Sequence, residues 1–440
     1  MLLHVPKKSI LSLGIFVFLP VVGCFIKNPG LGTICCLMEL GYIVFKARFS
    51  IVSVFSTLLN YCMIMEYLAY EKLYVYGLLN LKVVTVYYWE FVSCCFIFNI
   101  LTIILISTTN FLNDEKQLYN LNFNISGSLT TILLSVAILL TLMIFPSMPG
   151  TISDSNRFSS GILPFRGWSC IPFFFLAVGV LARKHVRIVV FGISFVCAWY
   201  VLHGERVEAI GMLIFGMLWF FNTRKVTLGK KIGIFILAVF TLFFLTAIGI
   251  FRGGTHSSFS MVIRNLIVQS TACDVTHTFN CAVDLWKKNS GYSGITYISY
   301  LINCIPLLKD DYSFQKRIAG DYRTAGGGIF FAEPYANGGI MLVLLFCTLW
   351  FVFIRIITKR KILYCTLIYI ELVLSIFRTA WYGLNYSIIT ILYFVPFVVL
   401  LNKLFLKRYQ NKREMKTNIW RYERIYKEQQ NTNLDLQRNK

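Results

Sequence analysis

The strongest constraint on this chain is a series of apolar runs, each long enough to cross a lipid bilayer as a helix. A transmembrane helix needs about 20 predominantly apolar residues, because the hydrocarbon core of a bilayer is about 30 Å thick. By this measure we expect about twelve membrane-spanning helices. They lie near residues 9–26, 30–46, 49–70, 83–107, 128–145, 167–182, 186–202, 206–221, 231–251, 339–358, 361–377 and 382–402. Since backbone polar groups in lipid must be satisfied within the protein, the sequence predicts an all-α polytopic membrane protein.

The composition agrees with this prediction. Of the 440 residues, 57% are hydrophobic and only 14% are charged, whereas about a quarter of the residues in a soluble domain are charged. Lys7 and Lys8 precede the first apolar run, but no small-residue cleavage pattern follows it. We therefore expect that run to be a retained helix and not a removed signal peptide.

Lysine and arginine in the connections predict the orientation, because short cytoplasmic loops carry an excess of both. With a cytoplasmic N-terminus, the inner connections and the tail hold most of the 42 basic residues. The inner clusters are Arg183/Lys184/Arg187, Arg224/Lys225/Lys230/Lys231 and Lys359/Arg360/Lys361. Both termini are then expected in the cytoplasm. The net charge of +22 indicates contact with anionic membrane lipids, and we do not expect nucleic-acid binding.

The chain divides into four regions. We expect transmembrane helices 1–9 over residues 1–251, a large extracytoplasmic loop over 252–338, transmembrane helices 10–12 over 339–402, and a basic cytoplasmic tail over 403–440. The loop is far longer than an ordinary connection, and such loops are usually functional or disordered. Apolar residues recur at helical spacing within 259–267 and 295–305, which predicts amphipathic helices that lie on the membrane or against the bundle.

The 13 cysteines lie mostly within apolar runs and show no metal-ligand spacing, so we expect them to act as small apolar packing residues. Cys273, Cys281 and Cys304 fall in the large loop, where an oxidising compartment would allow two of them to pair. The sequence leaves open whether Cys273 and Cys281 do so. No phosphate-binding loop, dinucleotide fingerprint or Cys/His cluster appears, so we expect no metal and no cofactor.

Ionisable residues within the apolar runs are the first candidates for function. Charge inside a membrane is costly and is usually retained for a reason. Glu39, Glu66, Glu90 and Glu371 lie within expected spans. The alternative is that each glutamate is a buried structural partner of an arginine.

Four arginines at expected outer junctions form the second candidate group. A single interfacial arginine is usually an anchor whose charged end reaches the water. Several together can hold a phosphate or pyrophosphate, because guanidinium binds phosphate bidentately and stays charged. These residues are Arg206, Arg252, Arg323 and Arg378. Glu205 and Glu333 are placed to orient them or to accept a proton.

The segment GGGIFFAEPYANGG, residues 326–339, combines five glycines with one carboxylate, that of Glu333. Glycines allow tight turns and close approach of the backbone to a ligand. The alternative is a flexible loop that ends where a helix begins.

With these features the chain resembles the oligosaccharide repeat-unit polymerases of bacterial O-antigen and capsule assembly, the Wzy type. Two motifs carry the resemblance: GERVEAIG at residues 204–211, and the Glu-x-Tyr-x-Asn-x-Gly pattern within GGGIFFAEPYANGG. The resemblance implies a glycosyltransferase on the outer side of the bacterial inner membrane. It would transfer a growing glycan from undecaprenyl pyrophosphate to a single lipid-linked repeat unit, and a flippase and a chain-length regulator are implied partners.

The resemblance also implies roles for individual residues. Glu333 is the expected base or arginine orienter, and Arg206 and Arg378 are expected to be catalytic. The expected substrate-binding residues are Arg252, Arg323, Tyr335, Asn337 and Glu205.

Two alternatives remain open at this point. An O-antigen ligase has a similar architecture and is associated with a histidine in the outer loop, for which His256 and His277 are available. A flippase or another transporter would need charge deep in the bundle, and Glu39 is the best evidence for it. Transporters often show two related halves, and the sequence shows no such internal symmetry.

Overall fold

The computed structural model describes residues 26–71, 85–147, 162–163, 168–224, 271–289, 291–303, 305, 312–322, 324, 327–383 and 385–408, with scattered positions within 14–23 and 227–241. Over these residues the protein is helical and contains no strand. The predicted all-α fold class is therefore confirmed.

The helices of the first half are α2 (Pro29–Ala47), α3 (Ile51–Tyr70), α4 (Tyr88–Thr108), α5 (Phe111–Asn120), α6 (Gly127–Ile144), α8 (Ile171–Ala182), α9 (Val186–Leu202) and α10 (Val207–Thr223). The second half contains α13 (Thr271–Asn289), α14 (Ile295–Asn303), α15 (Phe314–Tyr322), α16 (Ala332–Lys359), α17 (Leu363–Leu374), α18 (Ile376–Tyr382), α19 (Asn385–Ile389) and the π-helix η1 (Thr390–Phe394). Helical backbone continues from η1 to residue 408.

Six of the described helices are long and apolar enough to cross a membrane, and the bent pair α17 and α18 gives up to seven. Three expected spans correspond to shorter apolar helices, α8, α9 and α10. The expected spans at 9–26 and 231–251 lie largely outside the described residues. The structure is thus that of a multi-pass membrane protein, but it does not support the predicted count of twelve.

Helix ends explain this difference. A hydropathy window adds up side chains and does not register where the backbone leaves the helix. α8 has 12 residues and ends at Arg183, whose φ of 53° is left-handed. Twelve helical residues rise only about 18 Å, well short of the hydrocarbon core.

At one end of the bundle, basic side chains from several segments contact α5 and the residues that follow it. Asp114 on this helix forms ion pairs with Arg355 of α16 and with Lys361. The carbonyl oxygen of Tyr119 accepts a hydrogen bond from Arg183 Nη2 at 3.3 Å, and that of Ile125 accepts one from Lys184 Nζ at 2.8 Å. Basic connections expected on the same side of the membrane therefore meet at the same end. The assignment of this end, and of both termini, to the cytoplasm stays a prediction.

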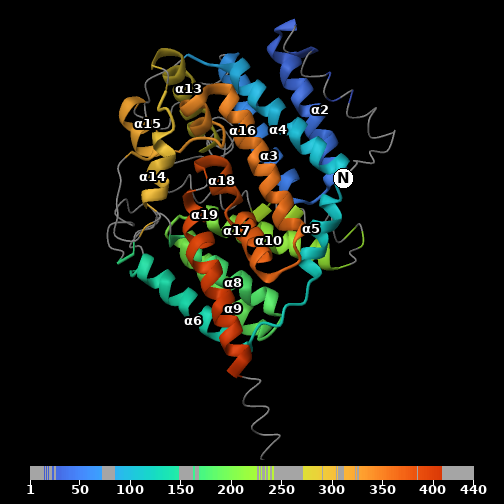
Figure 1. The fold of residues 1–440 in the computed structure, drawn as a ribbon, viewed down its shortest axis with the longest axis vertical. Coiled ribbons are helices and arrows are strands. Elements are labelled where there is room, and N and C mark those ends of the chain that lie inside the picture. The colour runs from blue at the N-terminus through green and yellow to red at the C-terminus, as the bar shows by residue number, and fades with distance from the viewer. Residues whose placement is uncertain are drawn as a thin grey trace, which may run out of the picture.

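The opposite end is built from the expected outer loop and the helix that follows it. Figure 1 shows α13, α14 and α15 gathered beside the start of α16, and α13 packs along α16 and α3. The stripe expected at 295–305 forms α14. The stripe at 259–267 lies outside the described residues, and α13 was not predicted from the sequence.

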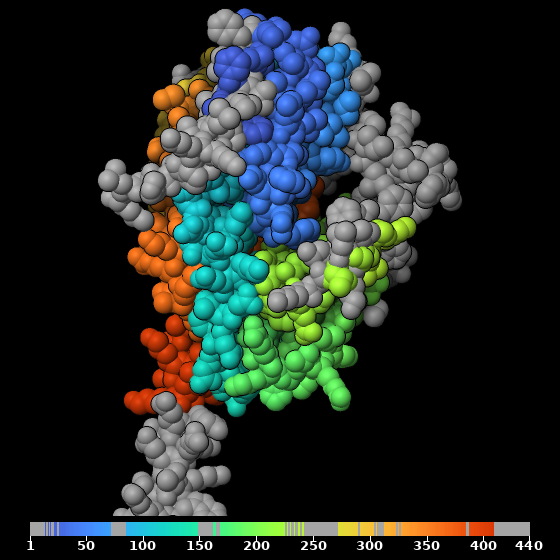
Figure 2. Space-filling view, turned by 90° about the vertical axis from the view of Figure 1, so that its right-hand side faces the viewer, coloured from blue at the N-terminus to red at the C-terminus, as the bar shows by residue number. Residues whose placement is uncertain are grey.

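The long helix α16 begins at Ala332, seven residues before the expected start of its span at 339. It is interrupted at Gly338 and Gly339, which have non-helical backbone angles. Below this break α16 packs along α4 and α5. Figure 2 shows α16, in orange, beside the cyan residues of these two helices. The break separates the first turn and a half of α16, which carries Glu333, from the apolar part of the helix.

Candidate functional site

The glycines of the segment 327–339 are closely packed. A Cβ atom added to Gly327 would lie 2.3 Å from Cε1 of Tyr382, and one on Gly328 would lie 2.8 Å from the Phe314 ring. Gly339 has a φ of +61° and lies against Trp286. A side chain at these positions would collide with a neighbour or strain the backbone. The glycines therefore bring the chain close to aromatic side chains, which argues against a flexible loop.

Glu333 lies in the first turn of α16 and has a fixed carboxylate. Thr296 Oγ1 donates a hydrogen bond to Oε1 at 2.7 Å, and the Tyr300 hydroxyl donates one to Oε2 at 2.6 Å. Both donors come from α14, where residues four apart share a face. The glutamate side chain is only 9% exposed. Two hydroxyl donors hold the carboxylate in one orientation.

Asn337 stands one helical turn after Glu333 and orients the donor. Its Nδ2 donates to Thr296 Oγ1 and to the carbonyl oxygen of Glu333, both at 2.8 Å. Its Oδ1 accepts a hydrogen bond from the Gly294 backbone at 2.8 Å. Because Thr296 accepts from Asn337, its own proton is directed to Glu333. The structure thus places Asn337 behind the carboxylate, as a positioning residue.

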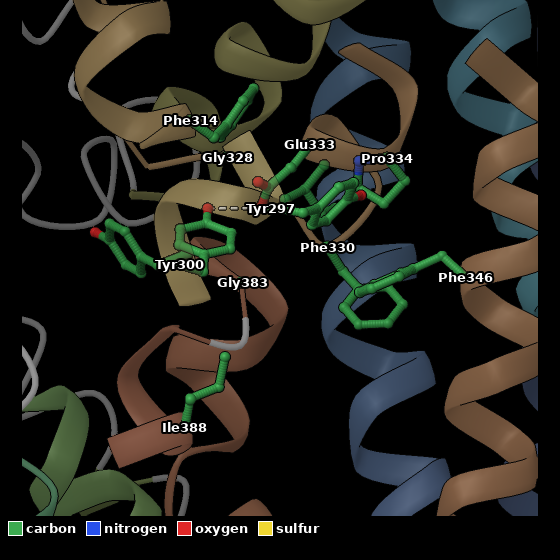
Figure 3. Close-up of a pocket in the computed structure, with 12 residues that line it drawn as sticks. Tyr297, Tyr300, Phe314, Gly328, Phe330, Glu333, Pro334, Phe346, Gly383 and Ile388 are labelled. Carbon is green, nitrogen blue, oxygen red and sulfur yellow. Dashed lines mark hydrogen bonds between the residues drawn. The ribbon is translucent and has the colours of Figure 1, made fainter. Parts of the chain in front are cut away.

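A cavity of about 90 Å³ lies beside Glu333. Figure 3 shows the Glu333 carboxylate and Tyr300 turned toward each other among aromatic side chains. The lining residues include Tyr297, Tyr300, Phe330, Phe346 and Tyr382. This volume holds a few water molecules or a small part of a ligand. The cavity is mostly apolar with one carboxylate on its wall, a lining found in ligand sites, but its volume is smaller than that of a typical ligand pocket.

Arg378 forms a second buried cluster at the same end of the bundle. Its Nε donates to Glu208 Oε1 at 2.9 Å, and its Nη2 donates to Glu205 Oε2 at 3.0 Å. The residue is 6% exposed. Two carboxylates already surround this guanidinium, so Arg378 is held rigidly. It differs from the open phosphate clamp that the sequence analysis expected.

Tyr382 joins the two clusters. The guanidinium of Arg378 lies 5.3 Å from the centre of the Tyr382 ring, and the same ring lines the cavity beside Glu333. Gly383 follows with a φ of +81°, and its Cβ position would be 3.9 Å from Glu333 Oε2. The short helix α18 therefore brings Arg378 and Glu333, which lie in different apolar segments of the sequence, into one site.

The remaining expected residues are distributed differently. Arg206 is half-buried at the start of α10, next to Glu205. Tyr335 is buried and packs against the Phe279 ring at 5.6 Å, and it does not line the cavity. Arg252 and Arg323 lie outside the described residues.

The glutamates within the apolar runs have different surroundings. Glu66 accepts a hydrogen bond from Asn280 Nδ2 at 2.9 Å, and Glu90 forms an ion pair with Lys287. Among the described residues, the carboxylate oxygens of Glu39 and Glu371 make no hydrogen bond of normal geometry. Neither of these two contacts, both between described residues, is the arginine pair that the alternative interpretation expected.

Cysteine and histidine residues of α13 are buried. Cys273 and Cys281 are not joined by a disulfide. His277 Nε2 lies 3.6 Å from Cys281 Sγ, and burial lowers the pKa of His277 to about 4. This histidine is therefore neutral at physiological pH, and it does not line the cavity. Within the described ranges, no group of three His, Cys, Asp or Glu side chains is arranged to bind a metal.

Sequence reasoning missed three members of the site. Thr296 and Tyr300 are spaced four residues apart on an amphipathic helix. This spacing predicts that they share a helix face, but it does not predict which part of the protein packs against that face. Glu208 lies three residues after Glu205 within GERVEAIG, so its spacing on a helix was the available signal.

Comparison with known proteins finds no match: no family model fits the sequence, no curated protein is significantly similar to it, and no solved structure matches at a significant level.

Proposed function

We propose that this protein is a membrane glycosyltransferase that polymerises lipid-linked oligosaccharide units. The substrate class is an undecaprenyl-pyrophosphate-linked oligosaccharide, and the site lies on the outer side of the bacterial inner membrane. One observation carries the proposal. A glutamate held by two hydroxyl donors lies on the wall of an aromatic cavity, and α18 connects it to a buried arginine cluster.

The reaction requires one base and a stabilised leaving group. The acceptor hydroxyl oxygen attacks the anomeric carbon of the donor, and the bond from that carbon to the pyrophosphate oxygen breaks. The bonding electron pair leaves with the lipid pyrophosphate, and Glu333 takes the hydroxyl proton. Proton transfer by a positioned carboxylate of this kind contributes about 10²–10⁴-fold to a rate.

The arginines are assigned different roles with respect to the pyrophosphate leaving group. Arg378 is balanced by Glu205 and Glu208, so we assign it to shaping the site through Tyr382. Arg206 is the described candidate for direct contact with the pyrophosphate. Arg252 and Arg323 keep the role that the resemblance implies. The twelve spans, the cytoplasmic termini and the partnership with a flippase and a chain-length regulator belong to the same proposal.

Deletion of the gene in its own strain tests the proposal. Loss of a polymerase leaves the core with a single repeat unit on a gel of surface polysaccharide. Loss of a ligase leaves bare core together with lipid-linked polymer, and loss of a flippase leaves neither polymer nor single units on the surface. An unchanged ladder would contradict a role in this assembly altogether.

A lipid-linked sugar flippase or another transporter is the second candidate. The observation that favours it is buried charge in the helices, since Glu39 and Glu371 are both fully buried. Intramembrane carboxylates often mark proton or ion pathways. Re-expression of Glu39→Gln in the deletion strain separates the two roles, because a polymerase whose site lies at Glu333 should keep its ladder.

A further inference from the structure

Two helices that face each other depart from regular α-helical geometry at the same place. α17 and α18 are bent by 63° at Ser375, and η1 is a π-helix that starts at Thr390. Sharp bends and π-turns inside helices have specific causes and are frequent at functional sites. In membrane proteins, paired helix breaks near buried charge often mark ion-binding positions.

Four side chains fill the space between these two breaks. Glu371 and Ser375 lie one turn apart on one segment, and Ser387 and Thr390 lie about one turn apart on the other. Ser387 Oγ donates to Ser375 Oγ at 2.6 Å, and Ser375 Oγ in turn donates to the carbonyl oxygen of Glu371 at 2.7 Å. Residues one helical turn apart lie on the same face, with Cβ atoms about 5–6 Å apart. The contact between Ser375 and Ser387 therefore brings the face that carries Glu371 against the face that carries Thr390.

This group is buried and incompletely satisfied. Glu371, Ser387 and Thr390 are each 0% exposed, and Ser375 is 1% exposed. Neither carboxylate oxygen of Glu371, nor Oγ1 of Thr390, makes a hydrogen bond of normal geometry with any described residue. The guanidinium of Arg378, on the adjoining helix α18, is engaged by Glu205 and Glu208. A carboxylate in such a position is unstable without a counter-charge.

The chemistry of the group defines the counter-charge that fits. All four side chains offer oxygen atoms, which are the ligands of hard cations. A single carboxylate supplies one negative charge, which matches a monovalent ion. A proton on Glu371 would neutralise the charge but would bridge at most one other oxygen, whereas a metal cation contacts the carboxylate and the hydroxyls together.

We propose that Glu371, Thr390, Ser375 and Ser387 bind one sodium ion between the α17–α18 break and η1. The ion would tie α18 to the helix that begins at residue 385. Because α18 carries Arg378 and Tyr382, the ion would fix the position of the arginine cluster. The proposal does not depend on glycosyl transfer and holds for a transporter as well.

The test is equilibrium binding of radioactive ²²Na⁺ to the purified full-length protein in detergent at constant ionic strength. We expect saturable binding of one ion per chain. Glu371→Gln should abolish it. Glu115→Gln is the matched control, since it also removes a buried carboxylate, and it should bind sodium like the wild type.

Two further variants keep the test decisive if Glu371→Gln does not fold. Thr390→Val and Ser387→Ala each remove one oxygen and should weaken sodium binding by about tenfold or more. Absence of saturable binding to the wild type would overturn the proposal, and so would unchanged affinity in both hydroxyl variants. Wild-type stability that depends on pH through Glu371 but not on sodium would show that a proton occupies the carboxyl, which also overturns it.

Discussion

Glu333 and Glu371 are both buried glutamates beside a helix break, but their surroundings differ. Glu333 accepts hydrogen bonds from two hydroxyls of α14 and borders a cavity. Glu371 makes no such bond among the described residues and is fully buried. Donors positioned in advance orient a carboxylate so that it can act as a base. A carboxylate without donors needs a counter-ion. Hydrogen bonding, more than burial, thus distinguishes the two.

The largest expected effect comes from replacing Glu333, the carboxylate that accepts hydrogen bonds from two hydroxyl groups. Glu333→Gln keeps the size of the side chain and removes the base, so the polymerisation rate should fall about 10²–10⁴-fold. At normal protein levels, the surface polysaccharide ladder should collapse to single units. Tyr335→Phe, in the same turn of α16 but away from the cavity, should retain the ladder. A normal ladder in Glu333→Gln would remove Glu333 from the chemistry.

The second prediction concerns a third buried carboxylate, Glu115 of α5, which accepts hydrogen bonds from the Tyr369 hydroxyl and the Ile51 backbone. Burial raises its pKa to about 7 despite these donors. The folded protein therefore holds this proton to a higher pH than the unfolded chain does. The stability that Glu115 contributes is complete below its unfolded pKa and is lost as pH rises through about 7, by up to about 3 kcal/mol.

Thermal unfolding in detergent from pH 5 to pH 8 measures this loss of stability. Glu115→Gln should make the stability nearly independent of pH over this range. The pKa of Asp114, the preceding residue, is shifted in the opposite direction. Burial raises its pKa, but hydrogen bonds and charges of Arg355 and Lys361 lower it further, so the net pKa is below the usual value. Asp114→Asn should therefore leave the slope from pH 5 to pH 8 intact and change stability only at more acidic pH. A flat wild-type profile would contradict the assignment for Glu115.

The third prediction tests the packing of the α17–α18 break. A Cβ added to Gly211 of α10 would lie 1.9 Å from the carbonyl oxygen of Leu374, which precedes the break. Gly211→Ala should destabilise the protein by about 1–3 kcal/mol, because backbone cannot move aside as a side chain can. Gly216→Ala on the same helix meets nothing within 4 Å and should be neutral or slightly stabilising. Equal melting temperatures for the two variants would refute this close contact.

The smallest expected effect concerns Thr296, one of the two hydrogen-bond donors to the Glu333 carboxylate. Thr296→Val removes a hydrogen bond and leaves the shape, which should cost about 1 kcal/mol in transition-state stabilisation, or about fivefold in rate. Thr296→Ser restores the hydroxyl and should restore the rate. Chain-length distributions of the two variants give the readout. Failure of serine to rescue would show that the methyl group, and not the hydroxyl, supports the site.

The sequence predicted the class of fold and part of the site. Apolar runs are enough to predict a helical membrane protein, because lipid leaves few other options. Glu333 was also predicted, since a lone carboxylate among glycines is unusual in an apolar chain. The partners were not predictable, because Thr296 and Tyr300 reach Glu333 only when α14 packs against α16. Helix breaks at Arg183, Ser375 and Gly338 depend on tertiary contacts as well, so apolar runs do not predict where each helix ends.

The roles of the four arginines could not be predicted from the sequence for the same reason. The four arginines share a residue type and an expected position, and the sequence cannot show which carboxylates approach them. Glu205 and Glu208 change Arg378 from an expected anion-binding group to a neutralised structural one. Charge counts along a sequence therefore overstate how many arginines remain for a ligand.

The ring of Tyr382 is confined by two different segments. The Gly327 backbone leaves no room on one side, since even a single Cβ would lie 2.3 Å from the ring, and the Arg378 guanidinium lies near the same ring. A methyl group at residue 327 would displace the ring, and the ring would displace the arginine. A change in the glycine-rich segment would thus alter the charge cluster of α18 without touching any charged atom.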